Sequence, residues 1–365
     1  MSEISTYKLI KEKLQAIPNN ALKGSWFEKV SKRFLKEHDS ADEYESIDLW
    51  NDWELNNNEG DRGIDMVITT ASKEYIKNKN LQESRKDRIR LALYRPFNKQ
   101  WLYWDKDWIS RQREFSKIFP DKDAQNVVIN TGVGNGKNFS ALVSDCISDF
   151  SLISSNQTYP LYCYDGLGNR HYAISGYALN LFRKHYEDNA ITEEEIFYYI
   201  YAILHHKGYL EKYKNSLAKE DPHIALSEDF KELSALGKEL AKLHLNYESE
   251  EMHTSVEYKT LMNAEEEGYY DVETMTKKGD RIHYNNHIAI TKIPKKAFEY
   301  VVNGKSAIDW VIECYKKTRD KDSLIENNPN DYKDGKYVFE LLCRVITLSV
   351  KSVDLIEKIS EKRFE

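Results

Sequence analysis

The chain has 365 residues, of which 41% are hydrophobic and 12% aromatic, so it can form a hydrophobic core in one large or two ordinary domains. The formal net charge of −7 argues against a uniformly basic nucleic-acid coat protein, although it allows a local basic patch. The four cysteines are scattered, without the spacing of a zinc site or of a disulfide framework.

The N-terminal part of the chain predicts two helices and then a strand. Apolar residues recur at helical spacing in residues 4–14 and again in residues 26–35. An acidic, irregular segment follows, and Ile64–Thr70 is rich in β-branched residues, which predicts a strand. The N-terminus contains no apolar signal core and no apolar run reaches the length of a membrane span, so we expect a cytoplasmic protein without membrane association.

Charge is distributed most unevenly between Lys73 and Lys117. This segment contains 13 lysines and arginines against 6 aspartates and glutamates, a local excess of +7. Apolar content also falls between residues 72 and 90. We therefore place a domain boundary near residue 80, which divides the chain into residues 1–79 and 80–365.

Residues 94–108 interleave aromatic rings with cations and amides, in the order Tyr-Arg-Pro-Phe-Asn-Lys-Gln-Trp-Leu-Tyr-Trp-Asp-Lys-Asp-Trp. Rings can stack on nucleic-acid bases or fill a core, cations can neutralise phosphates, and amides can pair with an adenine edge. The segment therefore supports both a structural and a DNA-binding interpretation. The candidate DNA-facing residues here and just beyond are Arg95, Lys99, Gln100, Arg111, Arg113 and Lys117.

The remainder of the chain predicts a mixture of strands and helices, and hence an α+β fold. Residues 178–250 read as helical, with Thr192 as an N-cap and Glu195 completing a capping box. Residues 307–315 and 337–359 predict further helices. Strands are predicted at 127–129, 139–143, 150–153, 159–165 and within 268–291.

Three short motifs invite functional interpretations that their details do not support. The glycine run 132–136 lacks the Walker spacing, and a strand-like segment follows it, so it predicts a tight turn. The segment Asn328–Tyr332 lacks the second proline of an adenine-methyltransferase loop and predicts a surface turn. His205 and His206 are adjacent on a predicted helix and face different directions, which disfavours a shared metal.

Several separated blocks, taken in order and spacing, resemble the C-terminal specificity domain of type ISP restriction-modification enzymes. Those are single-chain bacterial enzymes with nuclease, helicase-like, methyltransferase and target-recognition parts. The resemblance covers nearly all of residues 85–357. Its blocks are 95–97 with 101–103, 131–134, 139–142, 159–162, 196–205, 237–248 and 302–312.

This resemblance implies that residues 80–365 form a target-recognition domain containing a mixed sheet and helical bundle segments. Its expected partner is double-stranded DNA, together with a methyltransferase or helicase-nuclease subunit as a second candidate partner. S-adenosylmethionine and ATP belong to parts of the family that do not occur here. We therefore expect no cofactor in this chain.

The segments Gly24–Lys29 and Gly63–Val67 resemble the first half of an Mrr-like nuclease of the PD-(D/E)xK type. The resemblance implies a small α/β module in residues 1–79, with Glu28 and Asp65 as catalytic acids and Asp65 as a Mg²⁺ ligand. No strand carrying the Gln-x-Lys or Glu-x-Lys of that site follows. The favoured interpretation is an incomplete, inactive module, and Mg²⁺ is expected only if the nuclease is active.

The sequence thus leaves three functions open. The first is sequence-specific recognition of double-stranded DNA, without catalysis by this chain alone. The second is a Mg²⁺-dependent restriction endonuclease that uses Glu28 and Asp65. The third is a non-catalytic interaction module that targets a partner restriction enzyme.

Overall fold

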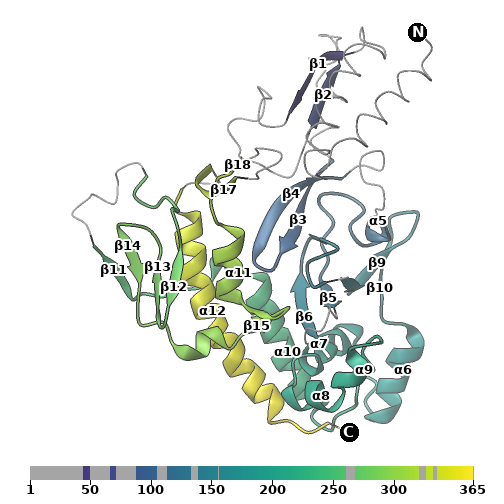
Figure 1. Ribbon diagram of the computed structural model, residues 1–365. Helices are drawn as coiled ribbons and strands as arrows, with labels where there is room; N and C mark the ends of the chain where they lie inside the picture. Colours follow the sequence, from purple (N-terminus) through teal and green to yellow (C-terminus); the bar gives the residue numbers. More distant parts are fainter. Residues whose placement is uncertain are drawn as a thin grey trace. The chain divides into compact units, whose positions relative to one another are not determined.

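A computed structural model describes most of the chain and divides it into two units (Figure 1). The first unit contains Met1–Arg88 and Lys316–Asp334, and the second contains Ile89–Tyr315 and Gly335–Glu365. The helices predicted before residue 36 lie outside the described residues. The residues that the structure describes are 44–49, 66–70, 88–104, 113–132, 139–154, 156–259, 268–319, 326–331 and 335–364.

The first unit contains two short antiparallel hairpins. Strand β1 (Tyr44–Leu49) pairs with β2 (Met66–Thr70), and β17 (Thr318–Arg319) pairs with β18 (Glu326–Asn327). The strand predicted at residues 64–70 is confirmed over Met66–Thr70, whereas β1 was not predicted. The 3-10 helix η6 (Pro329–Asp331) follows, and Pro329 is buried there although a surface turn was predicted.

The aromatic and cationic segment forms most of a hairpin in the second unit. Strand β3 (Ile89–Arg95) pairs antiparallel with β4 (Asn98–Tyr103), and the short strand β7 (Ile147–Ser148) adds to β3 in parallel. Phe97 makes the turn with a φ of 62° and buries its ring, which is 1% exposed. At this position, therefore, the structural interpretation of the segment holds.

A second sheet has the order β6-β5-β8, with all strands antiparallel. It consists of β5 (Val128–Gly132), β6 (Ser140–Ser144) and β8 (Gln157–Pro160). The predicted strands at 127–129 and 139–143 are confirmed in these positions. The chain continues into a separate hairpin, β9 (Tyr162–Tyr164) and β10 (Arg170–Tyr172).

The strand predicted at residues 150–153 is wrong, because these residues form consecutive turns. The backbone N–H of Ser151 donates to the Asp149 carboxylate, which bends the chain directly after β7. Leu152 and Ile153 still fill the core, at 0% and 1% exposure. Their apolar character thus reflects burial from a turn, and a short apolar run cannot distinguish that from a strand.

The region predicted as helical between 178 and 250 is confirmed as a set of helices. The capping box is present, since Thr192 Oγ1 accepts from Glu195 N at 3.2 Å and Thr192 N donates to Glu195 Oε2 at 2.9 Å. The elements here, and one short helix before them, are α5 (Phe115–Ile118), α6 (Gly176–His185), α7 (Glu193–Ile203), α8 (Lys207–Lys212), α9 (Lys214–Leu217), α10 (Phe230–Leu245) and η4 (Tyr247–Ser249).

The C-terminal part contains a four-stranded antiparallel sheet and two helices. The sheet has the order β11-β14-β13-β12, formed by Val256–Tyr258, Ile288–Ile290, Arg281–His283 and Thr276–Lys278. The predicted helices appear as α11 (Ala307–Cys314) and α12 (Tyr337–Ser360), and the α+β class is confirmed. The remaining elements are η5 (Lys295–Phe298), β15 (Val301–Val302) and β16 (Lys305–Ser306). Within the described residues, no helix is both long enough and apolar enough to cross a bilayer.

Helices α7 and α10 pack against each other at a point where only glycine fits. A Cβ added at Gly237 would lie 2.0 Å from the Tyr198 carbonyl oxygen and 3.1 Å from the Ala202 Cβ. Ser234 Oγ also donates to the Glu195 carbonyl oxygen at 2.9 Å, so α10 is hydrogen-bonded to the first turn of α7. The contact lies inside a hydrophobic cluster that both helices share.

Replacing Gly237 by alanine should therefore separate the two helices. We expect Gly237→Ala to lower the free energy of unfolding by about 3 kcal/mol, since the clash is with backbone that cannot rotate away. Urea unfolding measures this loss. The control is Gly176→Ala at the first position of α6, where a Cβ meets nothing within 4 Å of described atoms and helix propensity favours alanine. Equal stability of the two variants would contradict the proposed packing constraint.

A buried hydrogen-bonded chain joins α7, α10 and α12. Tyr201 Oη lies 2.6 Å from His244 Nδ1, and His244 Nε2 lies 3.0 Å from Ser352 Oγ, which donates to the Leu348 carbonyl oxygen. The Val143 N–H donates to Tyr201 Oη. Every group is satisfied if Tyr201 donates to Nδ1 and His244 carries its proton on Nε2. The network therefore requires a neutral imidazole.

Burial keeps two histidines of this region uncharged. It lowers the pKa of His205 to about 4, against hydrogen bonds to backbone carbonyls that raise it. Burial, with a further contribution from the nearby His205, also holds the pKa of His244 well below its ordinary value. A group whose folded pKa lies below its unfolded pKa binds fewer protons in the folded state. Folding stability is then complete above pH 6.5 and falls as the pH drops toward 4.

We expect the free energy of unfolding to fall by about 1.4 kcal/mol per pH unit for each of these histidines below pH 6.5. Urea midpoints between pH 5 and 7.5 would measure it. His205→Gln should reduce the slope of unfolding free energy against pH by the contribution of about one proton. His223→Gln, at a side chain that is 79% exposed, should leave the slope unchanged. Identical slopes in all three proteins would show that His205 does not resist protonation.

Candidate nucleic-acid interface

Arg95 is held in a fixed plane at the end of β3. Its Nη1 donates to Asp149 Oδ1 at 2.8 Å and to the Tyr94 carbonyl oxygen at 2.7 Å. Its Cζ lies 4.0 Å from the centroid of the Tyr94 ring. These contacts engage one guanidinium nitrogen, and Nη2 and Nε carry the further N–H groups. An arginine oriented in this way is suited to bidentate recognition of a planar acceptor.

A second arginine lies over a second exposed ring. Arg113 places its Cζ 4.3 Å from the centroid of Phe150, and that ring is 51% exposed. Tyr94 is 41% exposed. Phe150 follows Asp149 directly, and the Asp149 N–H donates to the Leu93 carbonyl oxygen at 3.0 Å, so both rings belong to one part of the second unit. We call Tyr94, Arg95, Arg113, Asp149 and Phe150 the arginine–aromatic edge.

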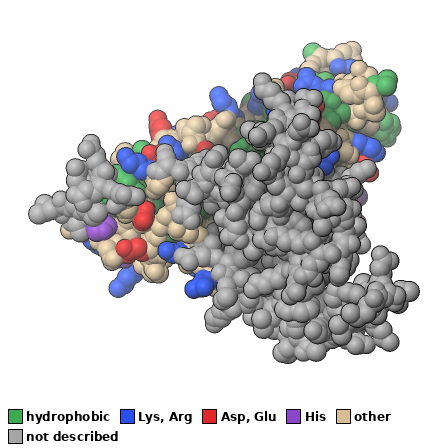
Figure 2. Space-filling model, turned by 90° about the horizontal axis from the view of Figure 1, so that it is seen from above, with side chains coloured by type: hydrophobic (Ala, Val, Ile, Leu, Met, Phe, Trp, Pro, Cys, Tyr) green, Lys and Arg blue, Asp and Glu red, His purple; other side chains and the backbone are tan. Residues whose placement is uncertain are grey.

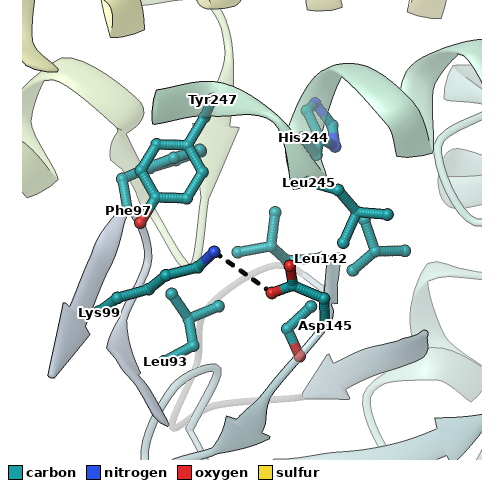
Figure 3. Close-up of a pocket in the computed structure, with 10 residues that line it drawn as sticks. Leu93, Phe97, Lys99, Leu142, Asp145, His244, Leu245 and Tyr247 are labelled. Carbon is teal, nitrogen blue, oxygen red and sulfur yellow. Dashed lines mark ion pairs between the residues drawn. The ribbon is translucent and has the colours of Figure 1, made fainter. Parts of the chain in front are cut away.

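Lys99 has a different environment, although it lies on the same hairpin. Its Nζ is 3.2 Å from Asp145 Oδ1, the ion pair drawn in Figure 3, and 3.6 Å from Glu248 Oε2, and its side chain is 12% exposed. The ammonium also lies 5.5 Å from the Tyr247 ring centroid. Burial alone would lower the pKa of Lys99, but the interactions with Asp145, Cys146 and Glu248 together outweigh it and hold the pKa above its ordinary value. The lysine therefore joins β4, the turn after β6 and η4.

The other predicted residues have mixed positions. Gln100 is half-buried in β4, opposite Ala92. Lys117 is exposed on α5 and pairs with Glu114 at 2.5 Å. Arg111 lies outside the described residues, as do Glu28 and Asp65. The structure thus brings together Arg95 and Arg113 at the edge, and directs Lys99 to acidic neighbours. Contact of any of these residues with DNA stays a prediction.

Sequence reasoning missed Asp149 and Phe150. Phe150 belonged to an apolar run that was assigned to a strand, and its exposure follows only from the turn that replaces it. Asp149 lies 54 residues from Arg95 in the chain, and no local pattern signals their pairing. Tyr94 belongs to the aromatic segment, and only the fold separates its exposed ring from the buried ring of Phe97.

Figure 2 shows the side chains of described residues only around a large part of the surface whose residues are not described. There, lysine and arginine side chains of the described residues are interspersed with acidic ones. This mixture of charges is consistent with the net charge of −7, so attraction of DNA would depend on local groups of cations. Among the described residues, no group of three histidine, cysteine or acidic side chains is arranged to hold a metal ion.

A family model described as the type ISP C-terminal specificity domain matches residues 23–341. The match takes in most of the chain, and the chain therefore belongs to this family. The matched span also includes Glu28 and Asp65, the two acids for which a nuclease site was predicted. Comparison with curated protein sequences gave no match.

Three solved structures resemble the chain closely. A nuclease-deletion mutant of the type ISP restriction-modification enzyme LlaGI in complex with a DNA substrate mimic is 35% identical, with a TM-score of 0.65 over 76% of this chain. The ATP-dependent type ISP enzyme LlaBIII bound to DNA is 32% identical, with a TM-score of 0.69 over 80%. The DrdV–DNA complex is 32% identical, with a TM-score of 0.68 over 75%.

The chain spans only part of each of these proteins. It covers 25% of the LlaGI chain, 21% of the LlaBIII chain and 28% of the DrdV chain. The similarity therefore concerns the specificity part, and the activities of the complete enzymes do not transfer with it.

The environment of Lys99 predicts a structural effect of its removal. We expect Lys99→Met, which keeps an apolar stem, to lower the free energy of unfolding by about 1–3 kcal/mol, because Asp145 and Glu248 would lose their shared cation. Urea unfolding measures this change. Unaltered stability together with weakened DNA binding would instead show that the Lys99 ammonium serves DNA. Lys214→Met, at an exposed position on α9, is the control.

Proposed function

We propose that this chain recognises a specific sequence of double-stranded DNA, as the specificity part of a bacterial type ISP restriction-modification system, without catalysis of its own. The observation that carries this proposal is the similarity of its fold, at 32–35% identity, to three proteins solved on DNA. The match to a specificity-domain family supports the same function.

In the proposed complex, the arginine–aromatic edge contacts the duplex. Arg95 presents the free N–H groups of its guanidinium to the O6 and N7 atoms of a guanine, the commonest specific contact of arginine with DNA. Asp149 is a positioning residue, because it accepts a hydrogen bond from Nη1 and thereby fixes the plane of the guanidinium, without contacting the base itself. Tyr94 and Phe150 supply exposed ring surface beside the two arginines.

The remaining predicted cations contribute phosphate contacts in this proposal. Arg113 and Lys117 are exposed, and the pair between Lys117 and Glu114 lies at the surface, where it is weak and readily exchanged for a phosphate. Arg111 belongs to the same segment. Gln100 is the candidate for an adenine contact, through the two hydrogen bonds that a glutamine amide can make.

The rest of a restriction-modification system enters this proposal as a partner. A methyltransferase or helicase-nuclease polypeptide would supply the reactions that use S-adenosylmethionine and ATP, and the complex would act in the cytoplasm in bacterial defence. The alternative, a non-catalytic module that only directs such a partner, differs from autonomous DNA recognition. Binding of DNA by the purified chain distinguishes the two, since a purely adaptor function would not require it.

The nuclease interpretation has less support. The specificity-domain family model begins at residue 23 and spans both Glu28 and Asp65, so the segment does not need a separate nuclease origin. An incomplete Mrr-like module using Mg²⁺ remains the alternative that the sequence offers for residues 1–79. Mg²⁺-dependent cleavage of plasmid DNA that is lost in Asp65→Ala would favour it.

Arg95 provides the sharpest test of the proposed function. A preferred site is first selected from random duplexes at a stated salt concentration with the wild-type chain. We expect Arg95→Ala to weaken binding to that site by about 1–3 kcal/mol and to relax preference at one guanine. Replacing that guanine by 7-deazaguanine, which lacks N7, should weaken the wild-type protein and leave the variant unaffected.

Two further variants control this experiment. Asp149→Asn removes the negative charge that pairs with Arg95 and should therefore reduce the preference for guanine. The variant should unfold at a similar urea concentration, because its carboxamide can still accept a hydrogen bond. Lys214→Ala removes an exposed cation from α9, at the opposite end of the second unit from β3 and β4 (Figure 1). Its affinity should match that of the wild type. Equal, weak affinity of the wild-type chain for every duplex would refute the proposed function.

A further inference from the structure

The β9–β10 hairpin carries a large apolar side chain at its tip. Leu167 is 88% exposed, the highest value among the exposed large hydrophobic residues described. It lies between Gly166 and Gly168, and a Cβ at either glycine would meet nothing within 4 Å in the part of the chain that the structure describes. Leu167 therefore stands clear of the domain. Single exposed apolar side chains are common on protein surfaces, and what sets Leu167 apart is its position at the tip of a hydrogen-bonded hairpin.

The tip is held rigidly around Leu167. Asp165 accepts from the backbone N–H groups of Leu167 and Asn169, each at 2.8 Å, and from Asn169 Nδ2 at 2.9 Å. The Gly168 N–H donates to the Asp165 carbonyl oxygen at 3.0 Å, with Gly168 at a φ of 82°. These bonds fix one turn geometry. The leucine is thus presented in a defined direction before any partner binds.

The base of the hairpin is equally fixed. Asn126, which is 5% exposed, donates to the carbonyl oxygens of Ile118 and Tyr162 and accepts from the N–H of Tyr162. The Ala173 N–H donates to the Leu161 carbonyl oxygen at 2.9 Å, where the chain leaves β10. Force applied at the tip would therefore pass into the core of the second unit, and the hairpin would not simply fold away.

Cations accompany the tip, and its carboxylate is occupied. Arg170 lies 4.2 Å from the ring centroid of Tyr162, which packs against Tyr172 at 4.9 Å. Burial raises the pKa of the Cys163 thiol on β9, and the positive charge of Lys117 on α5 partly opposes this increase. The Asp165 carboxylate is engaged by its own loop. These two cations favour the approach of a polyanion to this hairpin.

We propose that the β9–β10 hairpin enters the bound duplex and inserts Leu167 between two adjacent base pairs, which unstacks that step and bends the DNA. Apolar side chains on DNA-binding proteins act as wedges of this kind. The inference rests on the proposed function and adds to it a deformation of the target. One isolated leucine, with Asp165 and Asn169 two residues away on either side, suits a wedge, whereas docking of a protein needs a broad apolar patch.

The insertion makes sequence preference depend on more than direct contacts. Pyrimidine–purine steps unstack and kink more easily than other steps, so a wedge favours sites that contain such a step at the right place. Arg170 and Lys117 lie on either side of the β9–β10 pairing and would contact the phosphates that flank the opened step. The preferred site should therefore contain a flexible step that no base-reading side chain touches.

The test uses the full chain and duplexes of the site selected from the random pool, with 2-aminopurine placed at each position in turn. Wild-type protein should raise the fluorescence at one step, because unstacking relieves quenching. Leu167→Ala should abolish this rise and weaken binding about ten-fold, whereas Leu167→Met, which keeps a wedge, should retain both. Leu181→Ala, at a 41% exposed position on α6, is the matched control.

The outcomes separate this proposal from the proposed function. Selective binding by wild-type and Leu167→Ala proteins alike, with no fluorescence change in either, overturns the wedge and leaves DNA recognition standing. Failure of the wild-type chain to select any site overturns DNA recognition, and the wedge with it. Unchanged DNA behaviour of Leu167→Ala, combined with lost binding to a complete type ISP polypeptide, would assign the tip to a protein contact instead.

Discussion

The close approach of α7 and α10 at Gly237 is the constraint on which the second unit depends. It brings Tyr201 on α7 within hydrogen-bonding distance of His244 on α10, and the same hydroxyl accepts from Val143 on β6. One contact between helices thus fixes the position of the β6-β5-β8 sheet. A wider separation would break the buried chain at its centre and leave polar groups unsatisfied.

The surfaces proposed to contact DNA are built outward from this sheet. Strand β8 leads directly into the β9–β10 hairpin, and the turn after β6 supplies Asp145, which binds Lys99 of β4. The cations of the aromatic segment are thereby divided. Lys99 serves the interior, and Arg95 and Arg113 lie on exposed rings. A basic segment in the sequence is not one surface, because Arg95 ends β3, Lys99 lies in β4 and Arg113 precedes α5.

Local signals made much of this fold predictable. The capping box at Thr192, the apolar periodicity of α10 and α12, and the β-branched residues of β5 each specify an element from neighbouring residues alone. The pairings that build the candidate sites were not predictable in this way. Arg95 meets Asp149 across 54 residues, and the segment Lys316–Asp334 joins the first unit from far along the chain. Such contacts follow from topology, which composition and spacing do not encode.

Two ion pairs at the surface of the second unit show how a chain of net charge −7 could bind a polyanion. The Arg95–Asp149 pair has side chains that are 25% and 34% exposed, so it contributes little stability by itself. Its effect is on orientation, since an arginine already held in one plane loses less freedom when it binds a base. Lys117 and Glu114, at 66% and 71% exposure, can separate at small cost when a phosphate arrives. In the proposed complex, discrimination and electrostatic attraction would therefore rest on different residues, and only the attraction should weaken steeply with salt.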